Sequence, residues 1–392
     1  MDVYKFGGSS LATAERIRKV FADIKDVKNC VIVLSAVGKV DNNDIKLTDL
    51  LIDFCNARQK SAIQATNAIK RIHNKLYNIG KDLDLPDLYF QSLKKFLSDI
   101  YRFDDNYIVS RGEYFTCKMF SLFSGIEFIN SSDIIKFADD NFSYERTKNE
   151  IGKIKKAKFI TSGFYGSDGY GKIRLFPRGG GDITGAILAN IFKSETYFNC
   201  TDVKGIYTIP PDYSPKQNTI RQMNYAQLFY LCNHGNNAFS KDAIPFLAGK
   251  KINLIIKNSL DFDTPFTTVS DNSPNNDFTT IQIENGLNCF TIIKSEKSQL
   301  FRILYNILQI IMSDKISIYD IILTKKQCRI IYKTNKQIHL NLPPSASTYY
   351  TNQKLTAIRT TNFSKGKKGI SIKYVASSSP IKLKRIITSI LK

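Results

Sequence analysis

The stretch Val3-Tyr-Lys-Phe-Gly-Gly-Ser-Ser10 decides the fold, because an apolar strand stops there at two glycines and a helix begins just beyond them. Apolar residues then recur at helical spacing, at Ile17, Val20, Phe21, Ile24 and Val27. Glycines let backbone amides turn toward an anion, the helix N-terminus carries partial positive charge, and Lys5 adds a full charge. The pattern predicts a phosphate site. An ordinary strand-turn-helix remains the alternative, because the P-loop spacing Gly-x-x-x-x-Gly-Lys-Ser/Thr is absent.

Length and composition indicate a folded chain of two or three domains, since 43% of its 392 residues are hydrophobic. The net charge of +21 raises the question of a nucleic-acid partner. The lysines are spread along the chain and no recognition motif accompanies them. We therefore expect a solvated, lysine-rich surface and no nucleic-acid partner.

The cysteine and histidine patterns argue against disulfides and bound metal. The seven cysteines are scattered and never in Cys-x-x-Cys spacing, which predicts reduced thiols in a cytoplasmic protein. The three histidines have no spaced partners, so neither zinc chemistry nor a catalytic triad is expected. The N-terminus does not resemble a signal peptide, and the longest apolar segment, 300–312, is too short to span a membrane.

The region up to about residue 260 alternates between predicted strands and helices. The apolar run 30–36 predicts a central parallel strand, and it ends in Ser35-Ala-Val-Gly38, where an open α/β sheet places its ligands. Further strands are expected over 157–161, 195–200 and 252–256. Helices are expected over 47–76, 86–100, 183–192, 225–231 and 242–248. Residues 163–171 are predicted to be a flexible glycine-rich connector, and 261–277 an interdomain crossing.

Two further motifs carry charged residues. Glu113 follows Gly112 in the helical stretch 108–120, and by itself it fits a solvated surface residue. Arg178-Gly-Gly-Gly-Asp182 opens a helix, so unhindered amides, an arginine and the helix dipole converge there. The alternative is a glycine hinge whose Asp182 only caps the helix.

Beyond residue 285 the pattern changes to short strands with few helices. Residues 288–293, 297–312, 316–323 and 328–333 predict a β-α-β-β unit. A shorter second unit follows, with strands over 354–361 and 370–375 and a helix after Pro380.

Taken together, these motifs resemble the aspartate kinases of the amino acid kinase superfamily. The similar segments, in the family's order, are 3–10, Val-Leu-Ser-Ala at 33–36, Val-Ser-Arg-Gly-Glu at 109–113, 178–182 and Thr-Asp-Val-Lys-Gly-Ile-Tyr-Thr at 201–208. The resemblance implies a three-layer α/β catalytic domain over 1–262, in which helices sandwich the sheet, and a linker over 263–284. It also implies ferredoxin-like α+β ACT units over 285–392, through which the chain would form a homodimer.

The activity that the resemblance implies is transfer of the ATP γ-phosphate to the β-carboxylate of L-aspartate, with Mg²⁺ arriving on ATP. This is the first step toward lysine, threonine and methionine. The residue types fit this chemistry, because a carboxylate with a pKa near ~3.9 is already ionised and requires no general base. Another superfamily member, such as a glutamate or acetylglutamate kinase, is a further possibility that the C-terminal units argue against.

The resemblance also assigns roles to individual residues. It makes Lys5 and Asp182 catalytic. It places the γ-phosphate beside Lys5, Gly7, Gly8, Ser9 and Ser35. It gives nucleotide contacts to Thr201, Asp202 and Tyr207. It places aspartate beside Glu113, Arg178, Asp41 and Thr116.

The sequence departs from the family pattern in several places. Asp41 replaces a threonine that touches the substrate, and Gly181 replaces a residue with a hydroxyl. An arginine is absent around 210–212, and Asn237 replaces a lysine for which Lys216 or Lys241 could substitute. Each lost charge-assisted bond would cost about 1.5–3 kcal/mol if unreplaced. A catalytically impaired relative that acts by binding is therefore the alternative function, and departures at Arg302 and 324–325 predict weak feedback inhibition by lysine.

Overall fold

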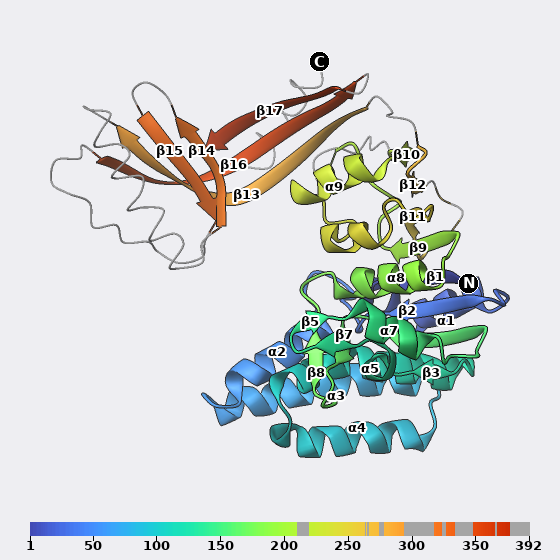
Figure 1. The fold of residues 1–392 in the computed structure, drawn as a ribbon. Coiled ribbons are helices and arrows are strands. Elements are labelled where there is room, and N and C mark those ends of the chain that lie inside the picture. The colour runs from blue at the N-terminus through green and yellow to red at the C-terminus, as the bar shows by residue number, and fades with distance from the viewer. Residues whose placement is uncertain are drawn as a thin grey trace. The chain divides into compact units, whose positions relative to one another are not determined.

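The computed structural model describes residues 1–209, 219–262, 264, 266–273, 278–293, 317–323, 327–333, 348–364 and 367–376. The chain divides into two compact units (Figure 1). The first comprises Met1–Ile206 and Thr219–Asn276, and the second comprises Tyr207–Asn218 and Asp277–Lys392.

An eight-stranded sheet forms the centre of the first unit, in the order β10-β12-β11-β9-β1-β2-β6-β3. The strands are β1 (Asp2–Phe6), β2 (Cys30–Leu34), β3 (Phe128–Ile129), β6 (Lys158–Ser162), β9 (Thr196–Thr201), β10 (Gln222–Met223), β11 (Asn253–Asn258) and β12 (Thr267–Val269). All neighbours pair in parallel except β11 with β12. The predicted α/β sheet is therefore confirmed. The expected interdomain crossing at 261–277 contains β12, a strand of this sheet.

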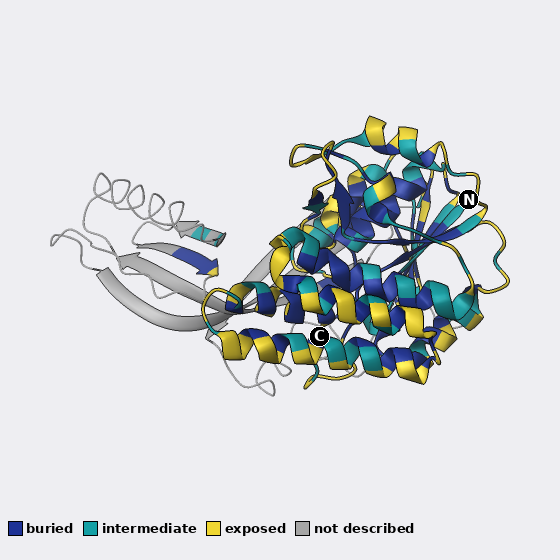
Figure 2. Cartoon of the chain, turned by 90° about the horizontal axis from the view of Figure 1, so that it is seen from below, coloured by how far each residue is buried: buried dark blue, intermediate teal, exposed yellow. Residues whose placement is uncertain are grey.

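The central strand β2 is buried along its whole length, as its continuous apolar run predicts. Cys30, Ile32 and Leu34 belong to the main apolar cluster on one face of the sheet. Val31 and Val33 alternate with them and are equally buried, so they face the opposite side. Figure 2 shows buried residues of the first unit's sheet in dark blue and, in yellow, the exposed outer faces of the helices that cover it.

The main apolar cluster joins the sheet to five helices, α1 (Ala14–Ile24), α2 (Leu47–Ala57), α3 (Ala62–Asp82), α4 (Asp87–Asp99) and α5 (Asp105–Ser124). The single helix predicted over 47–76 is wrong, because the chain breaks between α2 and α3. Ser61 accepts a hydrogen bond from the backbone N–H of Gln64 and so caps the start of a new helix. Pro86 directly precedes α4, as predicted.

The helix α8 (Gly180–Ile191) packs against β1, β2 and β9. The helix α9 (Tyr225–Asn233) follows β10, and the helix predicted near 242–248 is a 3-10 helix, η4 (Lys241–Phe246), with Pro245 inside it. The other elements before β6 are two short helices, α6 (Ser131–Ile134) and α7 (Tyr144–Ile151), a two-stranded ribbon of β4 (Phe137–Ala138) and β5 (Asn141–Phe142), and two 3-10 helices, η1 (Gly8–Leu11) and η2 (Ile100–Arg102).

The predicted flexible connector at 163–171 is wrong, because these residues enter a hairpin of β7 (Tyr165–Ser167) and β8 (Ile173–Leu175). The Asp168 carboxylate orders its turn by accepting hydrogen bonds from the backbone amides of Tyr170 and Lys172. It also pairs with the Arg174 guanidinium at 2.9 Å. A side chain that satisfies several donors of one turn explains why a glycine-rich segment adopts a defined structure here.

The second unit contains a five-stranded sheet in the order β14-β15-β13-β16-β17. Its strands are β13 (Phe278–Ile293), β14 (Ser317–Leu323), β15 (Gln327–Lys333), β16 (Thr348–Ser364) and β17 (Lys367–Ala376), all paired antiparallel. The strands predicted in this region are present, although β13 and β16 begin earlier than expected. The helices predicted at 297–312 and after Pro380 lie outside the described residues.

Candidate functional site

Several turns meet at the carboxyl edge of the central sheet. Because β1, β2, β6 and β9 are parallel neighbours, the loops that follow them lie at the same edge. The Gly38 amide donates to the Gly8 carbonyl at 2.8 Å, which joins the loops after β1 and β2. A Cβ on Gly8 would stand 2.5 Å from the Ala36 carbonyl oxygen, and one on Gly38 would stand 2.4 Å from the Gly8 carbonyl carbon. Only glycine allows the two backbones to approach this closely.

The loop after β6 and the start of α8 meet in the same way. A Cβ on Gly163 would lie 2.7 Å from the Gly181 Cα. The loop after β1 is joined to β9 as well, because the Gly7 amide donates to the Cys200 carbonyl at 3.1 Å. The sequence motifs that begin at Val3, Val33 and Arg178 therefore come together in one place.

Lys5 and Asp182 form an ion pair in this cluster of turns, with 2.7 Å between Lys5 Nζ and Asp182 Oδ1. Both side chains are largely buried, at 12% and 11% exposed. Asp182 Oδ2 accepts a hydrogen bond from the Ser240 backbone amide at 3.0 Å. The capping residue of α8 is Gly179, so the alternative in which Asp182 only caps the helix is wrong.

Ser35 lies beside this ion pair. A Cβ on Gly181 would stand 3.1 Å from Ser35 Oγ and 3.3 Å from Lys5 Cε. Gly181 therefore lies between the serine and the lysine, where any larger side chain would force a neighbour to move. The absent hydroxyl at this position leaves more room beside Lys5.

Glu113 extends from α5 and is 5% exposed, so its interpretation as a solvated surface residue is wrong. Burial raises the pKa of its carboxyl to about 8, although the backbone amide of Ala36 and the charge of Arg111 act in the opposite direction. Within the described part of the chain, Glu113 Oε2 has no hydrogen-bond partner. A buried carboxyl with an unused acceptor next to the Ser35–Gly38 loop is suited to receive a cationic group.

Thr116 is fully buried one turn beyond Gly112. Its hydroxyl accepts a hydrogen bond from the Val37 amide at 3.1 Å and donates to the Gly112 carbonyl at 2.7 Å. The hydroxyl proton and one of its two lone pairs are thus used within the protein, and Thr116 fixes the loop after β2 to α5. Its predicted contact with substrate would therefore be indirect.

Asp41 is exposed and folds back on its own turn. Its Oδ1 accepts hydrogen bonds from the amides of Asn43 at 2.7 Å and Asp44 at 3.2 Å. This carboxylate is engaged locally, which lessens the repulsion of an acidic ligand that its charge predicts.

Arg178 is exposed just before α8, and it forms no ion pair with the residues that the structure describes. The next residue, Gly179, has a φ of 83°, in the left-handed region that favours glycine. A Cβ there would also stand 2.6 Å from the Ser240 Cβ. The backbone conformation that brings Arg178 to the mouth of α8 therefore requires glycine.

The predicted nucleotide contacts begin where β9 ends. Thr201 is the last residue of that strand, and its hydroxyl lies 3.1 Å from an Asp202 carboxylate oxygen. Tyr207 is half-buried. Of the two lysines considered as substitutes for the absent charge, Lys241 directly follows Ser240, the residue bonded to Asp182. Lys216 and the segment 210–212 lie outside the described residues.

The sequence interpretation did not identify Arg111 as a buried residue, although its side chain is only 6% exposed and packs among tyrosine rings. Its guanidinium carbon lies 4.2 Å from the ring centroid of Tyr107 and 4.5 Å from that of Tyr114, with Tyr165 at 5.6 Å. Its Nε and Nη2 donate to Ser110 Oγ. The signal was present, because tyrosines four residues before and three residues after an arginine share its face of a helix.

Two classes of feature do not occur among the residues that the structure describes. No group of three or more histidine, cysteine, aspartate or glutamate side chains is placed to hold a metal ion there. Nor does any helix in those ranges combine the length and apolar character needed to cross a membrane.

Residues 2–258 match the model of the amino acid kinase family. The chain is 29% identical over 285 residues to aspartokinase 3 of Bacillus subtilis. The aligned segment covers 66% of this chain and 61% of that protein. It is also 29% identical over 252 residues to an aspartokinase of Chlamydia pneumoniae, covering 59% of this chain and 54% of the relative. The matches thus span little more than half the length of these relatives.

Solved structures extend the similarity to most of the chain. Clostridium acetobutylicum aspartate kinase superposes with a TM-score of 0.78 at 26% identity, over 93% of this chain and 87% of that one. Escherichia coli aspartokinase III, solved with aspartate and ADP, has the same fold, with a TM-score of 0.73 at 18% identity over 92% and 87% of the two chains. The family match covers the whole arrangement of strands and turns around Lys5 and Asp182, and the chain belongs to the amino acid kinase family.

Proposed function

We propose that this protein transfers the γ-phosphate of ATP to the β-carboxylate of L-aspartate and so forms 4-phospho-L-aspartate. The observation that carries the proposal is the buried Lys5–Asp182 pair among glycine-rich turns at the carboxyl edge of the sheet. The aspartokinases among the similar proteins support aspartate as the acceptor.

The phosphate end of the site would consist of the loops after β1 and β2. Lys5, held by Asp182, would supply positive charge to the transferring group, and the turn at Gly7, Gly8 and Ser9 would supply backbone amides. The Ser35 hydroxyl, beside Gly181, would donate to the same group. Thr201, Asp202 and Tyr207 would contact the rest of the nucleotide. Mg²⁺ would arrive as part of the MgATP substrate.

The acceptor end would use Glu113 and Arg178. An aspartate β-carboxylate is ionised at neutral pH, so the protein's task is to bring two anions together and to neutralise charge during transfer. The buried Glu113 carboxyl would receive the α-amino group, and the Arg178 guanidinium would bind a carboxylate as a two-pronged donor. Thr116 would act on this end by fixing the loop at Val37.

We also propose that residues 285–392 form an ACT-like region through which two copies associate, that 1–262 form the catalytic domain and that 263–284 connect them. The support is the sheet of the second unit, in which β15 lies between β13 and β14 as in a unit whose first strand pairs with its third. A cytoplasmic location is supported by five free thiols among the described cysteines, at 30, 55, 117, 200 and 232. Weak inhibition by lysine remains our prediction, and its residues, 302 and 324–325, lie outside the described ranges.

An ATP-dependent hydroxamate assay with L-aspartate tests the proposed activity. We expect a signal with L-aspartate that is lost in Lys5→Ala and is absent with L-glutamate or N-acetyl-L-glutamate. No signal from a folded wild-type protein that still binds MgATP would instead favour the impaired, binding-only relative. A signal with another acceptor would assign the chain to a different member of the family.

A further inference from the structure

The loop between β2 and α2 is held by residues outside the cluster of turns described above. It runs from Ser35 through Asp44 to the start of α2 at Leu47, and its first part contributes Ser35 and Gly38 to the site. At Val37 and Gly38 it is bonded to Thr116 and Gly8. In the remainder, Ile45 packs against the main apolar cluster, and the Leu47 amide donates to the Val37 carbonyl at 3.0 Å. Residues 39–43 are exposed, so polar contacts decide how this part of the loop is held.

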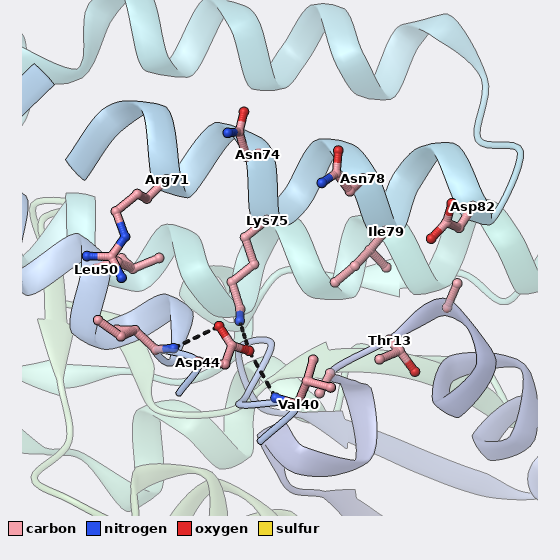
Figure 3. A pocket seen from close by; sticks show the side chains of 13 residues that line it. Thr13, Val40, Asp44, Leu50, Arg71, Asn74, Lys75, Asn78, Ile79 and Asp82 are labelled. Atoms are coloured by element: carbon pink, nitrogen blue, oxygen red, sulfur yellow. Dashed lines mark hydrogen bonds and ion pairs between the residues drawn. The ribbon is translucent and has the colours of Figure 1, made fainter. Parts of the chain in front are cut away.

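The Asp44 carboxylate accepts the hydrogen bonds that hold residues 39–46 in place. Its Oδ2 accepts from the Val40 amide at 2.9 Å, and its Oδ1 accepts from the Ile45 amide at 2.7 Å. Lys75, which extends from the middle of α3, brings its Nζ to 2.6 Å from the same Oδ2. Figure 3 shows the lysine reaching from its helix to the loop, with the amide of Val40 on the other side of the carboxylate.

The environment makes this ion pair stronger than an ordinary surface pair. The Lys75 side chain is 11% exposed and the Asp44 side chain 28% exposed. Burial alone would raise the pKa of Asp44, but the bonds from Lys75, Val40 and Ile45 lower it below its usual value. A partly buried pair that also satisfies two backbone amides is screened less by solvent than an isolated exposed pair.

A second cation, Arg16, bonds to the backbone of the same loop. Arg16, in the first turn of α1, donates from Nη1 to the Ser9 carbonyl at 2.9 Å. It also reaches the Lys39 and Val40 carbonyls at 3.5 Å. One arginine thus connects Ser9, which follows the Gly7-Gly8 turn, with Lys39 and Val40, so movement of residues 39–46 would be transmitted to that turn.

We propose that Lys75 is a positioning residue, which holds residues 39–46 through Asp44 and thereby keeps the Ser35–Gly38 turn against Gly8. Lys75 itself does not touch the ion pair of Lys5 and Asp182 in this arrangement. The consequence for catalysis rests on the proposed kinase function, whereas the consequence for the loop does not.

A groove of about 410 Å³ lies beside the pair and is lined by α3, the start of α1 and the loop. Its lining side chains nearest to Lys75 along α3 are one further cation, Arg71, and two amides, Asn74 and Asn78. Among the described residues Asp44 forms its ion pair with Lys75, so Arg71 would have to move to replace that lysine, and the groove admits water to the carboxylate. Loosening of the loop is the expected result.

The experiment compares Lys75→Met with Lys70→Met, a matched change at an exposed position of the same helix. Amide hydrogen exchange of the intact protein, read at Val40 and Ile45, is the first measurement. We expect exchange there to become about tenfold faster in Lys75→Met and to remain unchanged in Lys70→Met, because these amides donate to Asp44. Lys75→Arg, which preserves the charge, should restore most of the protection.

Kinetics are the second measurement. In the hydroxamate assay we expect kcat of Lys75→Met to fall about tenfold, with smaller changes in KM, since misplacement of the turn impairs the transfer step more than binding. Lys75→Met combined with Asp44→Asn should cost little more than either change alone, because the two side chains act as a pair. A thermal unfolding curve for each variant establishes that the protein is folded.

Two results would overturn the proposal. The first is exchange at Val40 and Ile45 that is as slow in Lys75→Met as in Lys70→Met. The second is faster exchange with unchanged kcat, because the loop would then move without consequence for catalysis. If the wild-type protein has no kinase activity, the proposed function fails, and the exchange measurement still decides whether Lys75 holds the loop.

Discussion

Lys5 Nζ lies 2.7 Å from Asp182 Oδ1, although the lysine belongs to the first strand and the aspartate to the first turn of α8. The second carboxylate oxygen of Asp182 is bonded to the Ser240 amide, so the aspartate is held from two sides. An ammonium group has three donors. After one is given to Asp182, two remain for a phosphate group placed among the neighbouring turns.

Removing either member of this pair should abolish most of the activity. We expect Lys5→Met and Asp182→Asn each to lower kcat about 10²–10³-fold, as when one preorganised charge is removed from a transfer site. The measurement is the rate of hydroxamate formation with L-aspartate. Lys153→Met is the control, because it breaks an exposed ion pair of the same length on the surface and should leave kcat unchanged.

A methyl group on Gly8 should disrupt the contact between the loops after β1 and β2. In Gly8→Ala the new Cβ would stand 2.5 Å from the Ala36 carbonyl oxygen and 3.1 Å from the Gly38 Cα and amide nitrogen. All three are backbone atoms, so none can rotate away as a side chain would. We expect kcat/KM to fall more than about tenfold and the melting temperature to drop by several degrees. The control is Gly152→Ala, where the nearest atom would be at 3.4 Å. Equal behaviour of the two variants would contradict the close contact.

The affinity for aspartate should depend on the ionisation of Glu113. Its pKa is raised to about 8 by burial, so at pH 6.5 the free protein carries a neutral carboxyl there. Binding of an ammonium group favours the carboxylate, and therefore KM for aspartate should fall as the pH rises from 6.5 to about 8. In Glu113→Gln the KM should be at least about tenfold higher and should lose this pH dependence. A wild-type KM that is constant over this range and equal to that of Glu113→Gln would show that Glu113 does not bind the substrate amine.

The same group makes a signed prediction for stability. Because the folded-state pKa of Glu113 lies above the ordinary 4.5, the folded state holds the proton more tightly than the unfolded state does. The contribution to the free energy of unfolding is therefore complete below about pH 4.5 and is lost as the pH rises toward 8. Urea unfolding at pH 5 and pH 8 should show a smaller decrease in Glu113→Gln than in the wild type. An identical decrease would indicate that Glu113 is ionised in the folded protein.

Thr116 should matter through the loop that it fixes. Thr116→Val removes the acceptor of the buried Val37 amide and should cost about 1–3 kcal/mol in the free energy of unfolding. Thr116→Ser retains the hydroxyl and should recover most of the stability and activity. If the threonine also touched the substrate directly, Thr116→Val would in addition raise KM for aspartate. Urea unfolding and the KM measured on one preparation distinguish the two.

The local motifs predicted much of the fold and of the candidate site. Apolar runs at 30–36 and 157–161 marked buried strands, because a strand covered on both faces must be apolar throughout. Glycine clusters marked the turns where strands end. The break between α2 and α3 was missed because the apolar spacing continues across it, whereas the chain is turned by a serine cap. The hairpin β7–β8 was missed because its order depends on one carboxylate, Asp168.

The sequence by itself determined which residue types are available at each strand end: a lysine before two glycines, a serine after a buried strand and an aspartate after three glycines. It did not determine which of them meet, because contacts between distant segments depend on strand order and on the space between backbones. Only the tertiary structure brought Lys5 to Asp182, buried Glu113, turned Asp41 back on its own loop and fixed Asp44 to Lys75. The physical reason is that burial and ion pairing are properties of the packed sheet and helices, and no local spacing encodes them.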